Sequence, residues 1–461
     1  MLGRKVSLIL VVTFLWILAS WPTLLSAQVR TEWVSRYAGF GPIWNNEAHA
    51  ITADVAGYVY VTGSVEVPGQ NDRDYTTIAY DPNGNEVWVA RYDGPAHRAD
   101  DAIAIAVDTK GYVYVTGSSY GQGTSSDYAT VKYDADGNEL WVARYDGPAH
   151  SAEVATAMAV DAYGNVYVTG WSIGDPLYMH NDFATVKYDA DGNELWAARY
   201  NGPGDSIEVP FAIAVDAEGN VYVTGFSGRA TPEGYHQEYN TVKYDPDGNQ
   251  VWVARYSDAR GTFSSSYALA LDSEGYVYVT GASQGVGGNS DYATIKYSPE
   301  GGRVWVARYS STGNGEAQSI ALDAEGNVYV TGVSQRRRGD LSSADYATVK
   351  YDPEGNEVWV ARYDGFGGGS DVARALALDS EGNVYVTGGS RGFRNSDYAT
   401  LKYDPDGNQL WVQRYYHPLV DGEDFARAIA VDQDGNIYVT GRSRGIGRGH
   451  EYATIKYSQG K

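Results

Sequence analysis

The feature that most constrains this chain is a four-residue marker, Tyr-Val-Thr-Gly, that occurs eight times at intervals of 51 to 56 residues. A period of this length is typical of architectures that repeat one supersecondary unit, so the repeat has to be assigned before any single element. The glycines that close the eight copies are Gly63, Gly117, Gly170, Gly225, Gly281, Gly332, Gly388 and Gly441.

Two more markers accompany each copy. One has the form Asp-Tyr-Ala-Thr-Val-Lys-Tyr and closes at Tyr80, Tyr133, Tyr188, Tyr244, Tyr297, Tyr351, Tyr403 and Tyr457. The other has the form Trp-Val-Ala-Arg-Tyr and begins at Trp33, Trp88, Trp141, Trp196, Trp252, Trp305, Trp359 and Trp411.

Each unit is expected to be a four-stranded antiparallel meander. In the unit at residues 211–256, runs rich in Val, Tyr, Ala and Trp at 211–216, 220–225, 238–245 and 250–256 are separated by two short turns and by a longer expected loop at 226–237. Gly219 and Gly248 stand where hairpin turns need a positive φ. Both faces of these strands are largely apolar, which favours sheets that pack face to face around an axis.

The order of the markers predicts ring closure. Trp33 precedes every other marker, whereas only four residues follow the last tyrosine marker at Tyr457. The strand at 31–37 would therefore complete the last blade, at about residues 425–458. We expect an all-β fold, an eight-bladed β-propeller of four-stranded antiparallel blades, that occupies residues 28–461 as a single domain.

The N-terminus resembles a signal peptide at residues 1–27. Arg4 and Lys5 precede an apolar stretch, and small residues allow cleavage after Ala27. We therefore expect a secreted protein, in the periplasm, at the cell surface or outside the cell. The alternative is a retained membrane anchor, because residues 6–27 are 22 uncharged residues. No later segment is apolar enough to span a membrane.

Charge and cysteine content exclude several classes. The net charge of −23 opposes binding to a phosphate backbone, so nucleic acid is not an expected partner. The absence of cysteine excludes disulfides, thiolate metal sites and a cysteine nucleophile. We expect a monomer.

The repeat markers resemble the bacterial β-propeller repeat called SBBP, over residues 31–458. That resemblance implies a propeller found in secreted and cell-surface bacterial proteins, and it implies no reaction. A more distant likeness is to the eight-bladed pyrroloquinoline quinone propellers, through turns such as residues 134–141. The adjacent cysteines of many quinone dehydrogenases have no counterpart here, so no cofactor is expected.

Residues present in nearly every repeat are interpreted as structural, because a catalytic group is needed once. This applies to the eight marker tryptophans, and to the Lys and Arg of the other markers, which we interpret as repeated ion pairs with carboxylates. The Asp-x-Asp-Gly-Asn turns are interpreted as hairpins, because the remaining ligands of a calcium loop are missing. We expect no metal and no catalytic residue.

Ligand binding is expected on the face of the ring that carries the longer, variable connections. All seven histidines are assigned to those loops. The candidate binding residues are Trp44, His97, His150, Trp171, His180, His236, Arg337, Arg391, Arg442 and His450.

The predicted function is that of a secreted, non-enzymatic binding or scaffold module. Its partner would be a protein, a glycan or a small polar ligand, and the arginines of the last three blades favour an anionic one. The alternative is an enzyme: a quinone-type oxidoreductase, or a lyase or hydrolase that pairs a variable-face histidine with Asp101, Glu153 or Glu208.

Overall fold

A computed structural model of the chain describes residues 29–459, with internal gaps at residues 42–44, 69–71, 175–179, 204–205, 232–233, 259–262, 286, 339–340, 367, 393 and 448. The signal peptide expected at residues 1–27 lies outside the described residues and stays a prediction. Within the described part, no helix has the length and apolar character needed to cross a bilayer.

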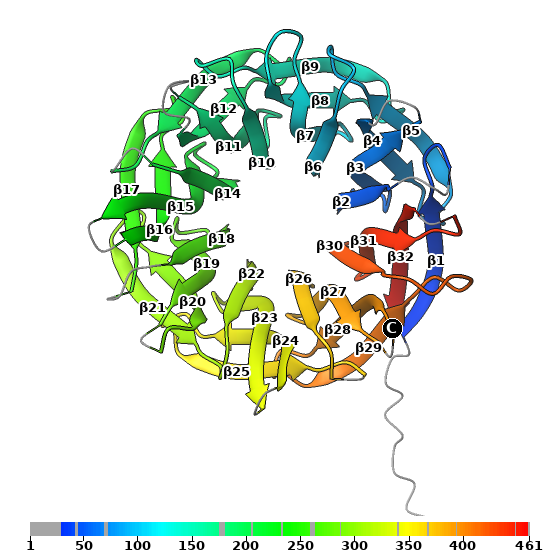
Figure 1. Cartoon of the computed structure of the whole chain (residues 1–461), viewed down its shortest axis with the longest axis vertical. Helices are drawn as coiled ribbons and strands as arrows, with labels where there is room; N and C mark the ends of the chain where they lie inside the picture. Colours follow the sequence, from blue (N-terminus) through cyan, green and yellow to red (C-terminus); the bar gives the residue numbers. More distant parts are fainter. Residues whose placement is uncertain are drawn as a thin grey trace, which may run out of the picture.

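The described residues form eight four-stranded antiparallel sheets arranged as blades around a central axis (Figure 1), which confirms the predicted eight-bladed propeller. We number the blades in chain order. Blades 1 to 4 comprise β2 (Glu47–Ala53), β3 (Val59–Val67), β4 (Asp72–Tyr80), β5 (Glu86–Tyr92); β6 (Asp100–Val107), β7 (Val113–Tyr120), β8 (Ser126–Tyr133), β9 (Glu139–Tyr145); β10 (Glu153–Val160), β11 (Val166–Ile173), β12 (Asn181–Tyr188), β13 (Glu194–Tyr200); and β14 (Glu208–Val215), β15 (Val221–Thr231), β16 (Gly234–Tyr244), β17 (Gln250–Tyr256).

Blades 5 to 8 repeat this order from the axis outward. They comprise β18 (Ser264–Leu271), β19 (Val277–Gln284), β20 (Ser290–Tyr297), β21 (Arg303–Tyr309); β22 (Gly315–Leu322), β23 (Val328–Arg338), β24 (Leu341–Tyr351), β25 (Glu357–Tyr363); β26 (Asp371–Leu378), β27 (Val384–Arg391), β28 (Ser396–Tyr403), β29 (Gln409–Tyr415); and β30 (Phe425–Val431), β31 (Ile437–Arg444), β32 (His450–Gln459) with β1 (Val29–Tyr37).

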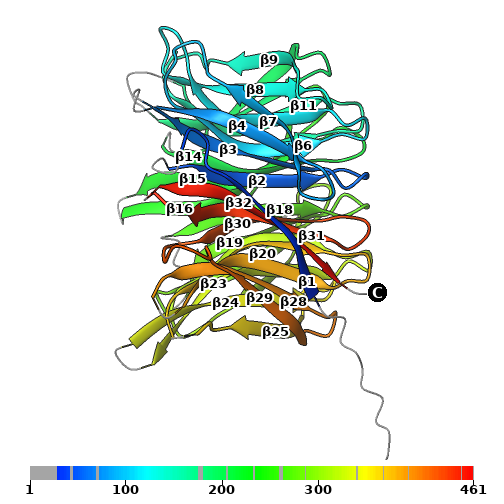
Figure 2. The same cartoon turned by 90° about the vertical axis from the view of Figure 1, so that its right-hand side faces the viewer.

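The ring is closed by β1, which forms the outermost strand of blade 8. It pairs antiparallel with β32, with Val34 opposite Ile455 and Tyr37 opposite Tyr452. Figure 2 shows β1 crossing beside β32 although the two strands come from opposite ends of the described chain. The predicted completion of the last blade by the N-terminal strand is thus confirmed.

The short turns fold the same way in each blade. In the turn after β16, Asp245 Oδ1 accepts hydrogen bonds from the backbone N–H groups of Asp247 at 3.0 Å and Asn249 at 2.8 Å. Gly248 has a φ of 85°, which a residue with a Cβ rarely adopts. The hydrogen bonds of the aspartate and the positive φ of the glycine together stabilise this hairpin turn.

The repeated tryptophans pack between blades. Trp141 of blade 2 lies against Tyr114, with ring centroids 6.3 Å apart, and its indole N–H donates to the Ala190 carbonyl of blade 3 at 3.1 Å. A Cβ on Gly192 would lie 2.7 Å from the indole ring, so glycine is required at that turn position. The same contact to a turn of the next blade is made by Trp33, Trp88, Trp196, Trp252, Trp305 and Trp359. Trp411 does not make it, because its indole N–H has no partner among the described residues.

The repeated cations have two different roles. The arginines form the expected ion pairs, as in Arg144–Asp127 at 2.8 Å and Arg362–Asp345 at 2.7 Å. The expectation of carboxylate partners for the lysines is wrong at several positions, where the ammonium group donates instead to a backbone carbonyl in a turn of the next blade. These lysines are Lys132, Lys187, Lys243, Lys350 and Lys456. Each ammonium also lies over a tyrosine ring, whose π face attracts a cation.

Several segments expected to be loops are strands. β15 and β16 remain paired as far as Thr231 opposite Gly234, although residues 226–237 were expected to form a loop. The antiparallel ladder satisfies the backbone polar groups of both segments whatever their side chains, so polar composition alone does not end a strand.

Candidate functional site

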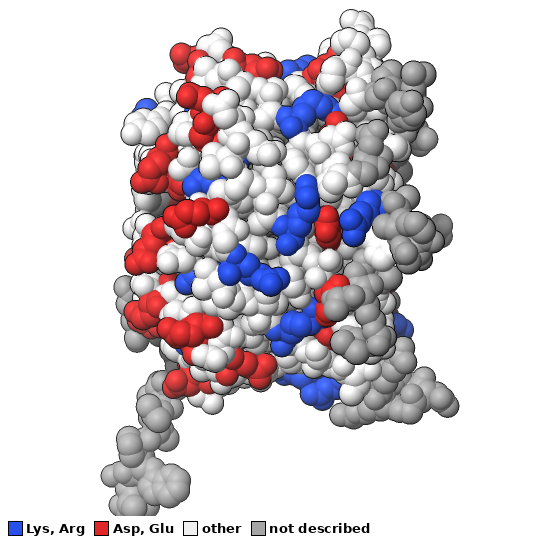
Figure 3. All heavy atoms as spheres, turned by 90° about the vertical axis from the view of Figure 1, so that its left-hand side faces the viewer, with Lys and Arg blue, Asp and Glu red and all other residues white. Residues whose placement is uncertain are grey.

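The propeller has two unlike rims. The turn rim carries the links between the first and second and between the third and fourth strands of each blade, and the loop rim carries the other connections. Figure 3 shows Asp and Glu gathered along one edge of the molecule, where the turn rim lies. The described residues of the loop rim carry the more varied side chains, so the candidate site is expected on this rim.

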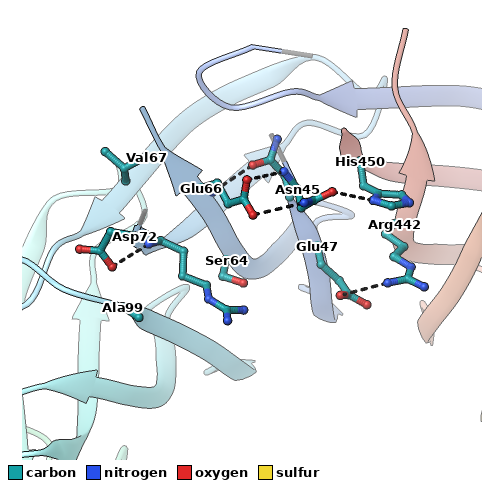
Figure 4. Close-up of a pocket in the computed structure, with 11 residues that line it drawn as sticks. Asn45, Glu47, Ser64, Glu66, Val67, Asp72, Ala99, Arg442 and His450 are labelled. Atoms are coloured by element: carbon teal, nitrogen blue, oxygen red, sulfur yellow. Dashed lines mark hydrogen bonds and ion pairs between the residues drawn. The ribbon is translucent and has the colours of Figure 1, made fainter. Parts of the chain in front are cut away.

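A pocket of about 510 Å³ lies on the loop rim where blades 8, 1 and 2 meet (Figure 4). Asn45, Glu47 and Arg73 of blade 1 line it together with Arg442 and His450 of blade 8. The pocket therefore spans the seam at which the two ends of the chain close the ring. It contains two residues proposed from sequence, Arg442 and His450.

Hydrogen bonds across the seam hold one wall of the pocket. Asn45 Oδ1 and His450 Nδ1 are 3.0 Å apart, and the Asn46 backbone N–H donates to the His450 carbonyl at 3.1 Å. The Asn45 backbone N–H donates to Glu66 Oε2 at 2.9 Å. Burial, together with the nearby Arg442 charge, lowers the pKa of His450, so its imidazole is neutral at neutral pH.

Glu47 is the charged centre of the pocket. Its carboxylate forms an ion pair with Arg427, and it lies 3.8 Å from Arg442 Nη1 and 3.9 Å from His49 Nε2. Burial opposes ionisation, but the contact with His49 and the charge and hydrogen bond of Arg427 hold the pKa of Glu47 at about 2. The pocket thus presents a fixed carboxylate beside cationic and amide groups.

One position in the repeat varies where its neighbours do not. It directly follows the marker glycine and is occupied, in blade order, by Ser64, Ser118, Trp171, Phe226, Ala282, Val333, Gly389 and Arg442. In blade 4, the Phe226 ring lies 6.1 Å from that of Phe211, which is itself 5.3 Å from Tyr267 of blade 5. The mouth of the ring is aromatic at blades 3 to 5 and charged at blades 8 and 1.

The structure assigns some of the sequence candidates to strands. The expectation that all seven histidines lie in loops is wrong, because His49, His236 and His450 belong to β2, β16 and β32. Trp171 likewise lies in β11, opposite Phe183 of β12. These strands run further toward the loop rim than their composition indicates.

The other candidates are dispersed over the loop rim. His97 and His150 have φ values of 50° and 48°, and each bonds the aspartate four residues earlier, which raises the pKa of both imidazoles. His180 directly precedes β12, Arg391 is exposed at the end of β27, and the backbone of Arg337 pairs with Ser342. Trp44 lies outside the described residues.

The carboxylates named for a catalytic alternative have other partners. Asp101 forms an ion pair with Arg73 at 3.0 Å. Glu153 and Glu208 are fully buried, and their Oε1 atoms accept hydrogen bonds from Ser172 and Ser227, each at 3.0 Å. The Asp101–Arg73 pair links blades 2 and 1, whereas the two serine contacts lie within blades 3 and 4.

Sequence reasoning missed Asn45, Glu47 and Arg73. A signal for Arg73 was available in principle, since no other blade has arginine at its position, whereas Asn45 and Glu47 recur in blade 6 as Asn314 and Glu316. It also missed three clusters of carboxylates between blades: Asp74, Asp93 and Asp100; Asp127, Asp146 and Glu153; and Asp345, Asp364 and Asp371. Burial raises the pKa of Glu153 to about 7 and that of Asp100 to about 6.

Comparisons with known proteins agree with the fold. The chain is 24% identical, over 79% of its length, to an uncharacterized WD repeat-containing protein of Acanthamoeba polyphaga mimivirus, and 29% identical, over 57%, to the regulatory protein FlaEY of Caulobacter vibrioides. It covers 31% and 30% of those two proteins, about a third of their lengths. The crystal structure of Sqt1 from Chaetomium thermophilum aligns with 94% of this chain and 100% of its own, at 10% identity and a TM-score of 0.58, which shows a shared fold.

Two family models match the sequence. The SBBP beta-propeller repeat matches residues 358–392 and 421–447, which confirms the resemblance carried by the repeat markers. A second model matches residues 41–294, more than half of the chain. The chain therefore belongs to the propeller family whose model is described as outer membrane protein assembly factor BamB.

Proposed function

We propose that this propeller is a non-enzymatic binding module that holds a protein partner on its loop rim, anchored in the pocket between blades 8, 1 and 2. The observation that carries the proposal is the convergence of Arg442, His450 and Arg73, none of which recurs at its position in another blade, on one pocket. Residues that depart from the repeat are not needed to build a blade, so their gathering in one place favours recognition.

The chemistry of the pocket suits a peptide segment. A guanidinium and amide groups can bind backbone carbonyl or carboxylate oxygens, while the Glu47 carboxylate can accept from N–H donors. The half-buried aromatic residues across the ring mouth, Phe211 and Phe226, offer an apolar surface to the same segment. A propeller of the same fold, Sqt1, has been crystallised bound to the N-terminus of the ribosomal protein L10, which illustrates such binding.

A glycan is the second candidate, and Trp171 favours it. This tryptophan is partly exposed in β11, at the position where four other blades carry Ser, Ala or Gly. A partly exposed indole provides the flat apolar surface on which a sugar ring packs.

Peptide display against the purified chain tests the protein-binding proposal. Peptides selected on the wild type should bind Arg442→Glu at least about tenfold more weakly, and the loss should shrink at high salt because it is electrostatic. Asp247→Ser, on the turn rim, is the matched control and should bind as the wild type does. Selected peptides that bind Arg442→Glu unchanged would refute the pocket as the anchor.

A glycan array separates the second candidate. Neutral and anionic sugars are compared at two salt concentrations, on the wild type and on Trp171→Ala. Binding that is lost with Trp171 and kept with Arg442→Glu would favour a glycan over a peptide.

We further propose that the chain is secreted after cleavage at residue 27, and that it is monomeric. The apolar N-terminal stretch supports export, as does membership in a family described as an outer membrane assembly factor. N-terminal sequencing of the protein from cells would distinguish cleavage from a retained anchor, and light scattering would give its mass.

A further inference from the structure

A group of three carboxylates joins blade 2 to blade 3 away from the pocket. Asp127 lies near the start of β8, Asp146 directly follows β9, and Glu153 opens β10 of the next blade. One carboxylate oxygen of each lies within 4.8 Å of the corresponding oxygens of the other two. Three anionic groups are therefore concentrated at a single blade junction.

Two of the three side chains are withdrawn from solvent, the Asp146 side chain is 28% exposed, and the hydrogen-bonding capacity of all three is only partly satisfied. Asp127 is 4% exposed and Glu153 is 0% exposed. Asp127 Oδ1, Asp146 Oδ1 and Glu153 Oε2 are each buried and have no hydrogen-bond partner. A buried carboxylate oxygen without a donor is costly, and three in one cluster indicate that a positively charged ligand belongs there.

The remaining oxygens of the cluster are already engaged. Arg144 donates to Asp127 Oδ2 at 2.8 Å, Ser172 donates to Glu153 Oε1 at 3.0 Å, and His150 Nδ1 lies 2.5 Å from Asp146 Oδ2. These contacts fix the orientation of each carboxylate. Arg144 pairs with Asp127 and His150 pairs with Asp146, while the unpartnered oxygens of all three carboxylates stay available to a cation.

We propose that Asp127, Asp146 and Glu153 bind a hard divalent cation of the calcium class at the junction of blades 2 and 3. The donor set consists of oxygens alone, which Ca²⁺ prefers and which does not favour zinc or copper. Carboxylates that bind in one-oxygen or two-oxygen modes, completed by water, give the coordination number that Ca²⁺ needs.

The same arrangement recurs at two more junctions. Asp74, Asp93 and Asp100 join blades 1 and 2, and Asp345, Asp364 and Asp371 join blades 6 and 7. Each contains a buried oxygen without a partner, on Asp100 or on Asp345. At the junction of blades 5 and 6, the equivalent residues are Asp291, Ser310 and Gly315, which retain one carboxylate. We therefore expect about three cations per chain, with none at that last junction.

These junctions differ from the Asp-Gly-Asn turns. In the turns, the aspartate oxygens already accept hydrogen bonds from their own loop, as Asp245 does from Asn249. At the junctions, the unpartnered oxygens come from three separate segments. The cation would consequently link two blades instead of stabilising a single hairpin.

Equilibrium dialysis of the full chain against Ca²⁺ at about 1 mM, followed by metal analysis, measures the stoichiometry. We expect about three Ca²⁺ per wild-type chain and about one fewer in the Asp146→Asn, Glu153→Gln variant, which keeps the side-chain shapes. Asp291→Asn, at the junction without a complete cluster, is the matched control and should bind as many ions as the wild type.

Thermal unfolding provides a second readout that does not depend on counting ions. In chelator, the double variant should melt at or above the wild-type temperature, because the buried charge of Glu153 and its repulsion by Asp146 have been removed. Added Ca²⁺ should raise the wild-type melting temperature more than that of the variant, since a ligand that binds the native state stabilises it. A wild-type chain that binds no more Ca²⁺ than the double variant would overturn the proposal.

Discussion

The turn rim and the loop rim are built on the same eight blades, yet they differ in how far their residues repeat. On the turn rim, the same aspartate and positive-φ glycine recur, for example at Asp134 and Gly137 and again at Asp245 and Gly248. On the loop rim, one repeat position holds Trp171 in blade 3 and Arg442 in blade 8. Repetition therefore marks the positions that build the ring, and departure from it marks the positions available for recognition.

The largest effect is expected from removing the strand that closes the ring. Deletion of residues 28–37 removes β1, which leaves β32 as an exposed edge and takes Trp33 from its contact with Tyr80 at 5.9 Å. We expect a loss of more than about 5 kcal/mol, enough to leave much of the protein unfolded. Urea denaturation measures it, and an unchanged midpoint would show that the ring does not depend on β1.

The next comparison is between a tryptophan at a repeated position and a tryptophan at a non-repeated position. Trp141→Ala removes a repeated inter-blade contact and should cost about 3 kcal/mol, whereas Trp171→Ala, at a non-repeated position on the loop rim, should cost about 1 kcal/mol. Denaturation of both variants under the same conditions checks this order. Equal losses would mean that repetition does not separate structural residues from the rest.

Two glycines in blade 2 isolate the contribution of the tryptophan contact. Gly137 and Gly111 have φ values of 84° and 82°, so alanine strains the backbone equally at both. A Cβ at Gly137 would lie 2.6 Å from the Trp88 ring, but at Gly111 its nearest neighbour would be 3.9 Å away. We expect Gly137→Ala to cost about 2 kcal/mol and Gly111→Ala about 1 kcal/mol, measured as unfolding free energies. Identical values would show that the Trp88 indole moves aside for the new methyl group at no cost in free energy.

Much of the fold could be predicted because repeated residues determine it. The period of the marker glycines predicts the blade number, and the displaced Trp33 predicts the closure, since both depend on local patterns. The turn geometry also follows from local Asp and Gly chemistry, as at Asp245 and Gly248.

The pocket could not be predicted in the same way, because it is made by residues far apart in the chain. Asn45 and His450 are separated by 405 positions and meet only after the ring has closed. The carboxylate clusters were not predicted for a similar reason, since Asp127 and Glu153 come from different blades. The expectation of no metal was based on the absence of cysteine and on the Asp-Gly-Asn turns, whose carboxylates accept hydrogen bonds from their own backbone.

The last effect concerns the charge held in the pocket. Because the folded pKa of Glu47, about 2, lies below its ordinary value of 4.5, its ionised form stabilises the fold above about pH 4.5, and that stability is lost as the pH falls through about 2. The wild type should therefore exceed Glu47→Gln by about 2 kcal/mol near neutral pH, and the difference should vanish near pH 2. In an Arg427→Gln background, the same substitution should have a smaller effect, because the main cation that favours the carboxylate is gone. Unfolding free energies measured from pH 2 to 7 test both statements. A difference in unfolding free energy between wild type and Glu47→Gln that is constant with pH would mean that Glu47 stabilises the fold through its shape and packing. Its charge would then make no contribution to stability.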